Sequence, residues 1–290
     1  MIVFISIPDH CIRCRDHQRN AFFIKITTKY NEDRIGVWDR MMEQGKSHRY
    51  KKDTTQGQKD GGAVNPPMKV IARIRTDFPT KFGLPRQSGI VESLKASIIF
   101  EPEYRNPEAF RGLEGFSHIW LIWGFSETVR DTWSPMVRPP RLGGVKRMGV
   151  FATRSPFRPN PIGLSSVKLE KVELYTDLGP VLHISGADLM DLTPIYDIKP
   201  YLPYTDCHPE ASGGFAEPVK DYALEVVFPE KWLDFIPEDR REALMGVLAH
   251  DPRPAYQRDP ERIYGFEFCG CDVRFRVRDK VLTVYEIVDL

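Results

Sequence analysis

Six short runs of strand-forming residues follow one another between residues 68 and 200, and no helical pattern separates them. Each run is rich in Val, Ile, Leu and aromatic residues and is bounded by Gly or Pro. A parallel, doubly wound sheet needs a helix between successive strands, so this order argues against that fold. It predicts a sandwich or a small closed β-barrel, of which we expect the barrel. The six runs are 68–76, 93–101, 116–127, 165–174, 180–191 and 193–200.

The third run, FSHIWLIWGF, is apolar at nearly every position. An uninterrupted apolar run of this length is typical of a strand that is covered on both faces. We therefore expect its outer face to be as buried as its inner face.

The pattern changes after Tyr222 and predicts a small α+β domain. Strand-like runs occupy 222–228, 262–268, 271–279 and 280–288, and one amphipathic helix is expected from Pro237 with Leu244, Val247 and Leu248 on its apolar face. In the run CDVRFRVRD, arginines alternate with apolar residues, which places Arg274, Arg276 and Arg278 on one face of a strand. A solvated strand face is the ordinary explanation of such a stripe.

Residues 1–67 differ from the rest and are expected to be a flexible extension ahead of a natural start at Met68. The stretch 51–67 is polar and rich in Gly and Pro, as in linkers. His10, Cys11, Cys14 and His17 include one C-x-x-C spacing, but no second half of a zinc site follows, so no metal is expected. The expected organisation is an extension 1–67, a barrel domain 68–206, a linker 207–221 and a C-terminal domain 222–290.

No segment has the length or flanks of an export signal or a membrane span. The run from Ile2 to Ile7 is short and lacks a basic flank, and the run from Ile119 to Phe125 is far shorter than a spanning helix. Five cysteines form an odd set. These features favour a reduced, cytoplasmic protein.

Charge is distributed unevenly, although the net charge is only +1. No Asp or Glu lies between Asp131 and Glu170, where the average acid content of the chain would place about five. A local basic patch of this kind predicts an anionic partner. The basic residues of this acid-free segment are Arg138, Arg141, Lys146, Arg147, Arg154, Arg158 and Lys168.

The acid-free segment contains GVFATRSPFRPNPIGLS, residues 149–165, which is stiff as well as cationic. Pro156, Pro159 and Pro161 fix their own φ and push the preceding residues into extended geometry, so part of the ordering entropy is lost before a ligand arrives. An arginine in such a loop presents a planar fork to a carboxylate or phosphate. The alternative is an arginine-bearing turn that pairs with surface acids.

A second dense stretch is DIKPYLPYTD, residues 197–206. It brings Asp197, Lys199, Tyr201 and Tyr204 together on another proline-stiffened loop, where a tyrosine ring could stack on a base. A surface loop with half-buried tyrosines is the commoner explanation. The chain has no P-loop, no G-x-G-x-x-G after a strand, no H-E-x-x-H and no G-x-S-x-G.

Several of these segments resemble the TsaA-like, or TrmO, family of tRNA methyltransferases. The resemblance spans 68–290 in order and rests on PRQSGIV (85–91), RGLEGFSHIWLI (111–122), RPPRLGGVKRMGVFATRSPFRPNPIGLS (138–165), DIKPYLPY (197–204) and LAHDPRPAY (248–256). It implies a non-Rossmann β-barrel that binds S-adenosylmethionine, a C-terminal domain that helps to hold tRNA, and a homodimer. The implied reaction methylates N6 of N6-threonylcarbamoyladenosine, the modified base beside the anticodon.

The resemblance also implies which residues bind the methyl donor. Ser126 departs from the pattern, since relatives often carry histidine at that position. The implied donor-binding residues are Gln87, Ser88, Gly89, Phe125, Ser126, Arg154, Leu164, Ser185, Gly186, Ala187 and Asp188.

Methyl transfer from a sulfonium needs alignment and a partly apolar wall more than a metal or a covalent nucleophile. The accepting nitrogen must lose a proton, so Asp197 and Tyr201 are candidate bases. The target base must leave its stack, and Tyr201, Tyr204 or Phe157 could receive it. Expected contacts to tRNA are Arg138, Arg141, Arg147, Arg158, Lys199, Tyr204, Arg274 and Arg276, with Arg278 on the same strand as the last two.

Two other functions stay open on the sequence. One is an RNA-binding barrel without a donor site, and the other is a small-molecule methyltransferase on the same barrel. Donor titration tests the first, and competition by tRNA tests the second.

Overall fold

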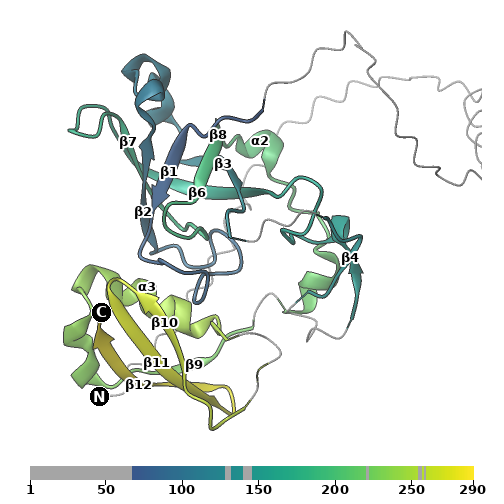
Figure 1. Cartoon of the computed structure of the whole chain (residues 1–290), viewed down its shortest axis with the longest axis vertical. Coiled ribbons are helices and arrows are strands. Elements are labelled where there is room, and N and C mark those ends of the chain that lie inside the picture. The colour runs from purple at the N-terminus through teal and green to yellow at the C-terminus, as the bar shows by residue number, and fades with distance from the viewer. Residues whose placement is uncertain (1–66, 128–131, 140–145, 220–221, 254–256, 258) are drawn as a thin grey trace, which may run out of the picture. The chain divides into compact units, whose positions relative to one another are not determined.

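Six antiparallel strands close into a barrel in the order β1-β2-β7-β6-β3-β8 (Figure 1). The computed structural model describes residues 67–127, 132–139, 146–219, 222–253, 257 and 259–290. Each of the six runs expected from the sequence supplies one strand, and the predicted closed barrel is confirmed. The strands are β1 (Ala72–Arg75), β2 (Lys95–Phe100), β3 (His118–Gly124), β6 (Ile162–Glu173), β7 (Val181–Ser185) and β8 (Pro194–Pro200).

Side chains that alternate along the strands fill the barrel interior. In β3 the inward residues Ile119, Leu121 and Trp123 are buried, whereas Trp120 and Ile122 between them are only half-buried. The expectation of equal cover on both faces is therefore wrong. Closure of the barrel buries only the inner face, and Tyr201 covers part of the outer one by packing its ring 5.5 Å from that of Trp120.

The C-terminal residues form a four-stranded sheet in the order β10-β11-β12-β9, packed against helix α3. The expected helix is confirmed, with Leu244, Val247 and Leu248 buried. Strand β11 alternates as predicted, with apolar residues in the core and arginines outside. The bounds are β9 (Glu225–Val227), α3 (Glu238–Ala249), β10 (Tyr264–Phe268), β11 (Cys271–Arg278) and β12 (Val281–Asp289).

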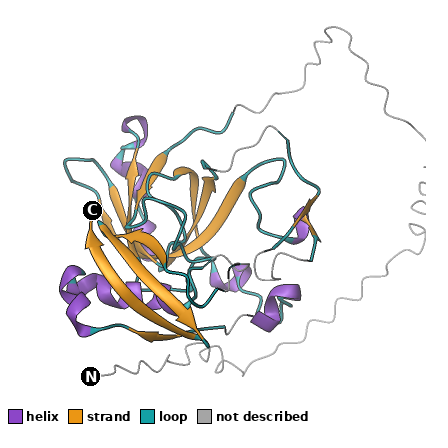
Figure 2. Cartoon of the chain, turned by 60° about the horizontal axis from the view of Figure 1, so that its bottom comes forward, coloured by secondary structure: helices purple, strands orange, loops and turns teal. Residues whose placement is uncertain are grey.

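The remaining elements are short, and strands dominate the described residues (Figure 2). Strands β4 (Met136–Val137) and β5 (Met148–Gly149) pair with each other as a small separate ladder. Helix α2 (Pro203–Asp206) follows the barrel. The 3-10 helices are η2 (Pro102–Tyr104), η3 (Pro107–Phe110), η4 (Leu113–Gly115), η6 (Val150–Ala152), η7 (Gly214–Val219) and η8 (Glu230–Phe235).

The loop between β1 and β2 connects the barrel to the C-terminal core. Phe78 packs in that core with its ring centroid 5.2 Å from that of Phe268, and Val91 and Leu94 join the same cluster. Within the described ranges, no helix is long and apolar enough to cross a membrane. The N-terminal cluster His10, Cys11, Cys14 and His17 lies outside the described residues, as does nearly all of the expected extension.

Candidate active site

The proline-stiffened loop between β5 and β6 is held by its own hydroxyl groups. Thr153 Oγ1 donates to the carbonyl of Val150 (2.8 Å) and accepts from the amide of Ser155 (3.3 Å). Ser155 Oγ accepts from the amide of Phe157 (3.3 Å), and Arg158 Nη1 donates to the carbonyl of Thr153 (2.8 Å). These bonds fix the backbone on both sides of Arg154, so its side chain leaves a preorganised base.

Arg154 brings this loop to the PRQSG turn. Its guanidinium donates to the side-chain amide oxygen of Gln87. Two residues further on, the amide of Gly89 donates to the carbonyl of Gly186 (2.8 Å). Gly89 and Gly186 both have positive φ, +76° and +77°, a conformation that side chains disfavour. Three segments that are distant in sequence, 85–89, 153–161 and 185–188, therefore meet at one place.

A buried polar chain ends at Asp188 in this cluster. Trp123 Nε1 donates to Ser165 Oγ (3.0 Å), and Ser165 Oγ donates to Asp188 Oδ1 (2.6 Å). Ser165 is only 1% exposed. Gly163, paired with Trp123 across the strands, makes this possible, because a Cβ at Gly163 would lie 2.2 Å from the indole ring. These two hydrogen bonds hold the carboxylate of Asp188 in one orientation.

Burial raises the pKa of Asp188 above its ordinary value. The hydrogen bond from Ser165 and the positive charge of Arg154 oppose that rise. The site thus combines a carboxylate that is costly to ionise with a nearby guanidinium.

Other residues expected at the donor site lie around this cluster in different settings. Phe125 packs on Trp123 with ring centroids 4.5 Å apart, which supplies an apolar wall, and Ser126 beside it is exposed. Leu164 is 55% exposed and Ala187 is buried in the barrel core. Ser185 instead donates its hydroxyl to Glu170 Oε1 (2.7 Å).

The two candidate bases lie on β8 and just after it. Asp197 is opposite Ile122, which is itself opposite Leu164, so these three residues are neighbours across three strands. Asp197 Oδ2 pairs with Lys199 Nζ at 2.8 Å. The backbone amide of Tyr201 donates to the carbonyl of His118, at the first residue of β3. His118 and Trp123 are about 16 Å apart along that strand, so Tyr201 lies far from the Asp188 cluster. Tyr204 is 86% exposed.

The expected tRNA-binding arginines fall into two groups. Arg138, Arg147 and Arg158 of the first group, together with the donor-site residue Arg154, are called here the loop arginines. They form no ion pair within the described part of the chain. Arg141 lies outside the described residues. In the second group, on β11, Arg274 pairs with Asp272 and Glu286, Arg278 pairs with Glu261, and Arg276 lies over the ring of Tyr285.

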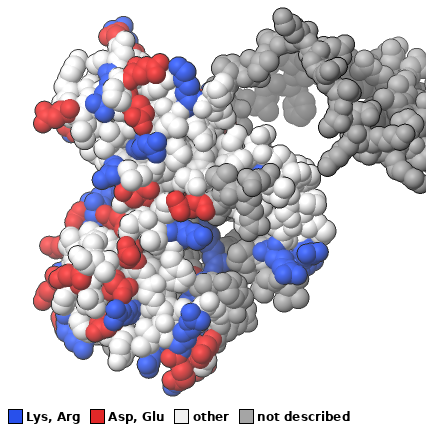
Figure 3. Space-filling model, viewed as in Figure 1, with Lys and Arg blue, Asp and Glu red and all other residues white. Residues whose placement is uncertain are grey.

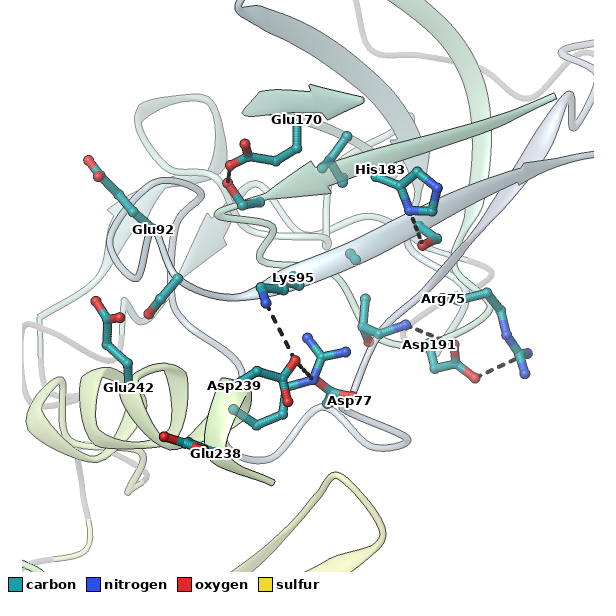
Figure 4. Close-up of a pocket in the computed structure, with 17 residues that line it drawn as sticks. Arg75, Asp77, Glu92, Lys95, Glu170, His183, Asp191, Glu238, Asp239 and Glu242 are labelled. Atoms are coloured by element: carbon teal, nitrogen blue, oxygen red, sulfur yellow. Dashed lines mark hydrogen bonds and ion pairs between the residues drawn. The ribbon is translucent and has the colours of Figure 1, made fainter. Parts of the chain in front are cut away.

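A groove of about 800 Å³ lies elsewhere, between the barrel and helix α3 (Figure 4). Figure 4 shows Glu92, Glu170, Glu238, Asp239 and Glu242 around it, with Lys95 bonded to Asp239. Gln87, Arg154 and Asp188 do not line it, and its excess of acids would repel phosphates. We therefore place the candidate site at the Arg154 cluster rather than in this groove.

Sequence reasoning missed Trp123 and Ser165 as supports of Asp188, and it missed an exposed aromatic pair, Trp133 and Phe151. The first two sat in an apolar run and an alternating strand, where both look like ordinary core residues. Trp133 lies at the start of the acid-free segment, ahead of its first arginine, Arg138. Its isolation in an acid-free stretch was the available signal.

The residues at the cluster suit a ligand with charges of both signs. S-adenosylmethionine carries a carboxylate, an ammonium group and a sulfonium, and the cluster offers a guanidinium, an amide, a carboxylate and the aromatic ring of Phe125. The side chains of the cluster therefore fit the groups of this methyl donor. No group of three or more His, Cys, Asp or Glu residues within the described ranges is arranged to hold a metal ion.

Comparison with known proteins identifies relatives along both parts of the described chain. The tRNA-methyltransferase O N-terminal domain matches residues 73–207, and the TrmO C-terminal domain matches residues 222–290. The tRNA (adenine(37)-N6)-methyltransferase of Escherichia coli is 41% identical over 225 residues, which are 75% of this chain and 95% of the relative. A Pseudomonas aeruginosa protein named "Putative S-adenosylmethionine-dependent methyltransferase RcsF" is 39% identical over 221 residues, 71% of this chain and 90% of its own.

A solved structure agrees with both domains. The crystal structure of TrmO from Pseudomonas aeruginosa superposes with a TM-score of 0.62 at 31% identity, covering 78% of this chain and all of that one. The resemblance seen in the sequence is thus confirmed over most of the chain, in fold as well as in sequence. The chain belongs to the tRNA-methyltransferase O family.

Proposed function

We propose that this protein transfers a methyl group from S-adenosylmethionine to N6 of the adenosine beside the anticodon of tRNA. The names of its relatives give the reaction class. The observation that carries the proposal for this chain is that Gln87, Arg154 and Asp188 lie together in one charged cluster. Each comes from a different segment that resembles the family. The substrate base in this proposal is N6-threonylcarbamoyladenosine, as the resemblance implies.

The donor would be held by the three segments that meet at this cluster. Arg154 would grip an anionic group of the donor or the substrate, because its fork is fixed by the preorganised loop. Phe125 would provide the apolar wall, and Asp188 would face a positive or hydroxyl-bearing part of the donor. The proposed set also includes Ser88, Gly89, Ser126, Leu164, Ser185, Gly186 and Ala187.

The bound donor supplies an electrophilic methyl group whose positive charge disperses during transfer. The chain must then align the accepting nitrogen and remove its proton. Asp197 is the better placed of the two candidate bases, since it lies two strands from Leu164 on the same outer face. Its partner Lys199 has a raised pKa because of their hydrogen bond.

We also propose that Arg138, Arg141, Arg147 and Arg158 approach tRNA phosphates, and that the protein acts as a homodimer in the cytoplasm. Residues 68–206 would hold the donor, 207–221 would link the domains, and 222–290 would help to hold tRNA. Residues 1–67 would be an extension that the reaction does not need.

The test is a methylation assay with the purified full chain, isotope-labelled S-adenosylmethionine, and tRNA with or without the threonylcarbamoyl group. Nucleosides from the product are then analysed by mass spectrometry. The proposal expects one added methyl group on threonylcarbamoyladenosine and none on the unmodified tRNA. A protein that binds tRNA but not the donor would be a binding module. Donor turnover that leaves no methyl group on tRNA would indicate a small-molecule substrate.

A further inference from the structure

Two large aromatic rings stack on each other at the surface beside β4 and β5. Trp133 is 48% exposed and Phe151 is 72% exposed. Their centroids are 6.1 Å apart and their planes differ by 24°, so the two rings are roughly parallel; this exposed aromatic pair is called here the ledge. Exposed aromatic groups of this size commonly mark an interaction site.

The backbone under both rings is fixed by hydrogen bonds. The amide of Ser134 donates to the carbonyl of Phe157 (3.0 Å), and the amide of Val150 donates to the carbonyl of Pro135 (3.0 Å). Ser134 Oγ also donates to the carbonyl of Met136 (2.7 Å). The ledge is therefore in place before a partner arrives, which lowers the entropic cost of binding.

A guanidinium adjoins the ledge. Arg158 lies 5.9 Å from the centroid of the Phe151 ring, and its bond to the carbonyl of Thr153 holds it there. Arg154, which belongs to the proposed donor site, is three residues from Phe151. Aromatic rings combined with arginines are the usual means of binding unpaired nucleotides, in which rings stack on bases and cations meet phosphates.

The charge around the ledge favours nucleic acid over a second copy of the chain. Figure 3 shows Lys and Arg on the lobe that carries β4, and no Asp or Glu is visible among the described atoms of that lobe. In a two-fold symmetric dimer the same patch would meet itself, so its arginines would repel each other. A nucleic acid with unpaired bases would attract these arginines instead of repelling them.

We propose that Trp133 and Phe151 form a stacking platform for an unpaired base of the tRNA anticodon loop, next to the base that is methylated. This inference rests on the proposed function and adds the contact that would orient the loop. It assigns base stacking to this ledge rather than to Tyr204.

The experiment measures binding of an anticodon stem-loop RNA that carries the fluorescent base 2-aminopurine at one loop position after another. The full chain is compared with Phe151→Ala and Trp133→Ala. Each alanine variant should bind about tenfold more weakly, as expected for the loss of one stacked base. The wild type should quench 2-aminopurine at one or two loop positions, and the variants should not.

Three controls separate stacking from other effects. Phe151→Trp should retain binding, because it keeps a ring at that position. Tyr175→Ala removes an aromatic residue that is 84% exposed on the turn after β6 and should leave binding unchanged. The slope of affinity against salt should be the same in Phe151→Ala as in the wild type, since no phosphate contact is lost.

Specific results would overturn the inference. If the wild type binds RNA and Phe151→Ala binds it equally well, the ledge is not a platform. A changed molecular mass of Phe151→Ala in light scattering would assign the ledge to an interface between copies, and a loss of donor affinity would assign it to the donor site. If the wild type binds neither tRNA nor donor, the proposed function itself fails.

Discussion

The loop arginines near the barrel and the arginines of β11 have the same chemistry but different surroundings. Arg154 contacts an amide, and Arg158 contacts a backbone carbonyl and a ring. On β11, Arg274 bonds Asp272 at 2.8 Å and Glu286 at 2.7 Å. The first group therefore keeps its charge available for an outside anion, whereas acids of the same sheet already satisfy Arg274.

The contrast shows that counting basic residues does not locate an anion site. A surface salt bridge contributes little to stability, but it lowers the field that a distant phosphate experiences. What distinguishes the loop arginines is the lack of acids over residues 132–169. Four experiments can break or sharpen this comparison.

The largest expected effect is the loss of ligand affinity in Arg154→Ala. Loss of a charge-assisted hydrogen bond should weaken binding of S-adenosylmethionine or of tRNA by about 10- to 100-fold. Arg154→Lys should recover only part of it, because an ammonium lacks the planar fork. Arg274→Ala is the matched control and should change donor affinity by less than about twofold. Calorimetric titration measures both, and unchanged affinity for donor and tRNA in Arg154→Ala would contradict the role.

Asp188→Asn tests the buried carboxylate that lies near Arg154. Its pKa is raised in the folded state, so the folded protein binds that proton more tightly than the unfolded chain does. Wild-type stability should therefore decline as pH rises from the ordinary carboxyl pKa through the raised one. The Asn variant lacks this loss and should melt about 2–4 °C higher at pH 7, with no gain at pH 4.

The same variant should bind the donor about tenfold more weakly at pH 7, because a charged partner is lost. Thermal melts with and without donor give both quantities. If Asp188→Asn is no more stable at neutral pH, Asp188 is not the strained carboxylate that its burial implies.

Salt dependence distinguishes the two arginine groups directly. Arg147→Ala should reduce the slope of log affinity for tRNA against log salt by about 0.9, the value for one lost phosphate contact. Arg274→Ala should leave the slope unchanged. Asp272→Asn combined with Glu286→Gln should expose Arg274 and increase the slope. Equal slopes for Arg147→Ala and Arg274→Ala would remove the distinction between the groups.

The smallest effect is expected for Ser165→Ala. The Ser165 hydroxyl lowers the pKa of Asp188, so its removal raises that pKa. As the pH falls and Asp188 takes up a proton, Ser165→Ala should therefore lose donor affinity at a higher pH than the wild type does. Trp123→Phe keeps the Ser165 hydroxyl and should shift this midpoint less. The measurement is donor affinity from pH 5 to pH 8. An unshifted midpoint in Ser165→Ala would show that the hydroxyl does not tune Asp188.

Sequence reasoning succeeded for the fold where the relevant signal was local. All six barrel strands and the C-terminal helix followed from runs of apolar residues between Gly and Pro, because strand and helix formation respond to a few neighbouring residues. The outer face of β3 was misjudged, since its cover depends on Tyr201 from a distant segment. For the site, the FATRSP loop was indicated by its charge and its prolines, and PRQSG and residues 185–188 were indicated by the resemblance, while Ser165 and Trp133 carried no recognisable motif.

The sequence by itself determined the strands, the amphipathic helix, the stiff acid-free loop and the alternation of β11, because each depends on chemistry within one short segment. Only the tertiary structure decided that Gln87 meets Arg154, that Ser165 holds Asp188 and that Glu286 neutralises Arg274. These pairs join residues on separate strands and loops. Their contact depends on strand register and barrel closure, which spacing along the chain does not specify.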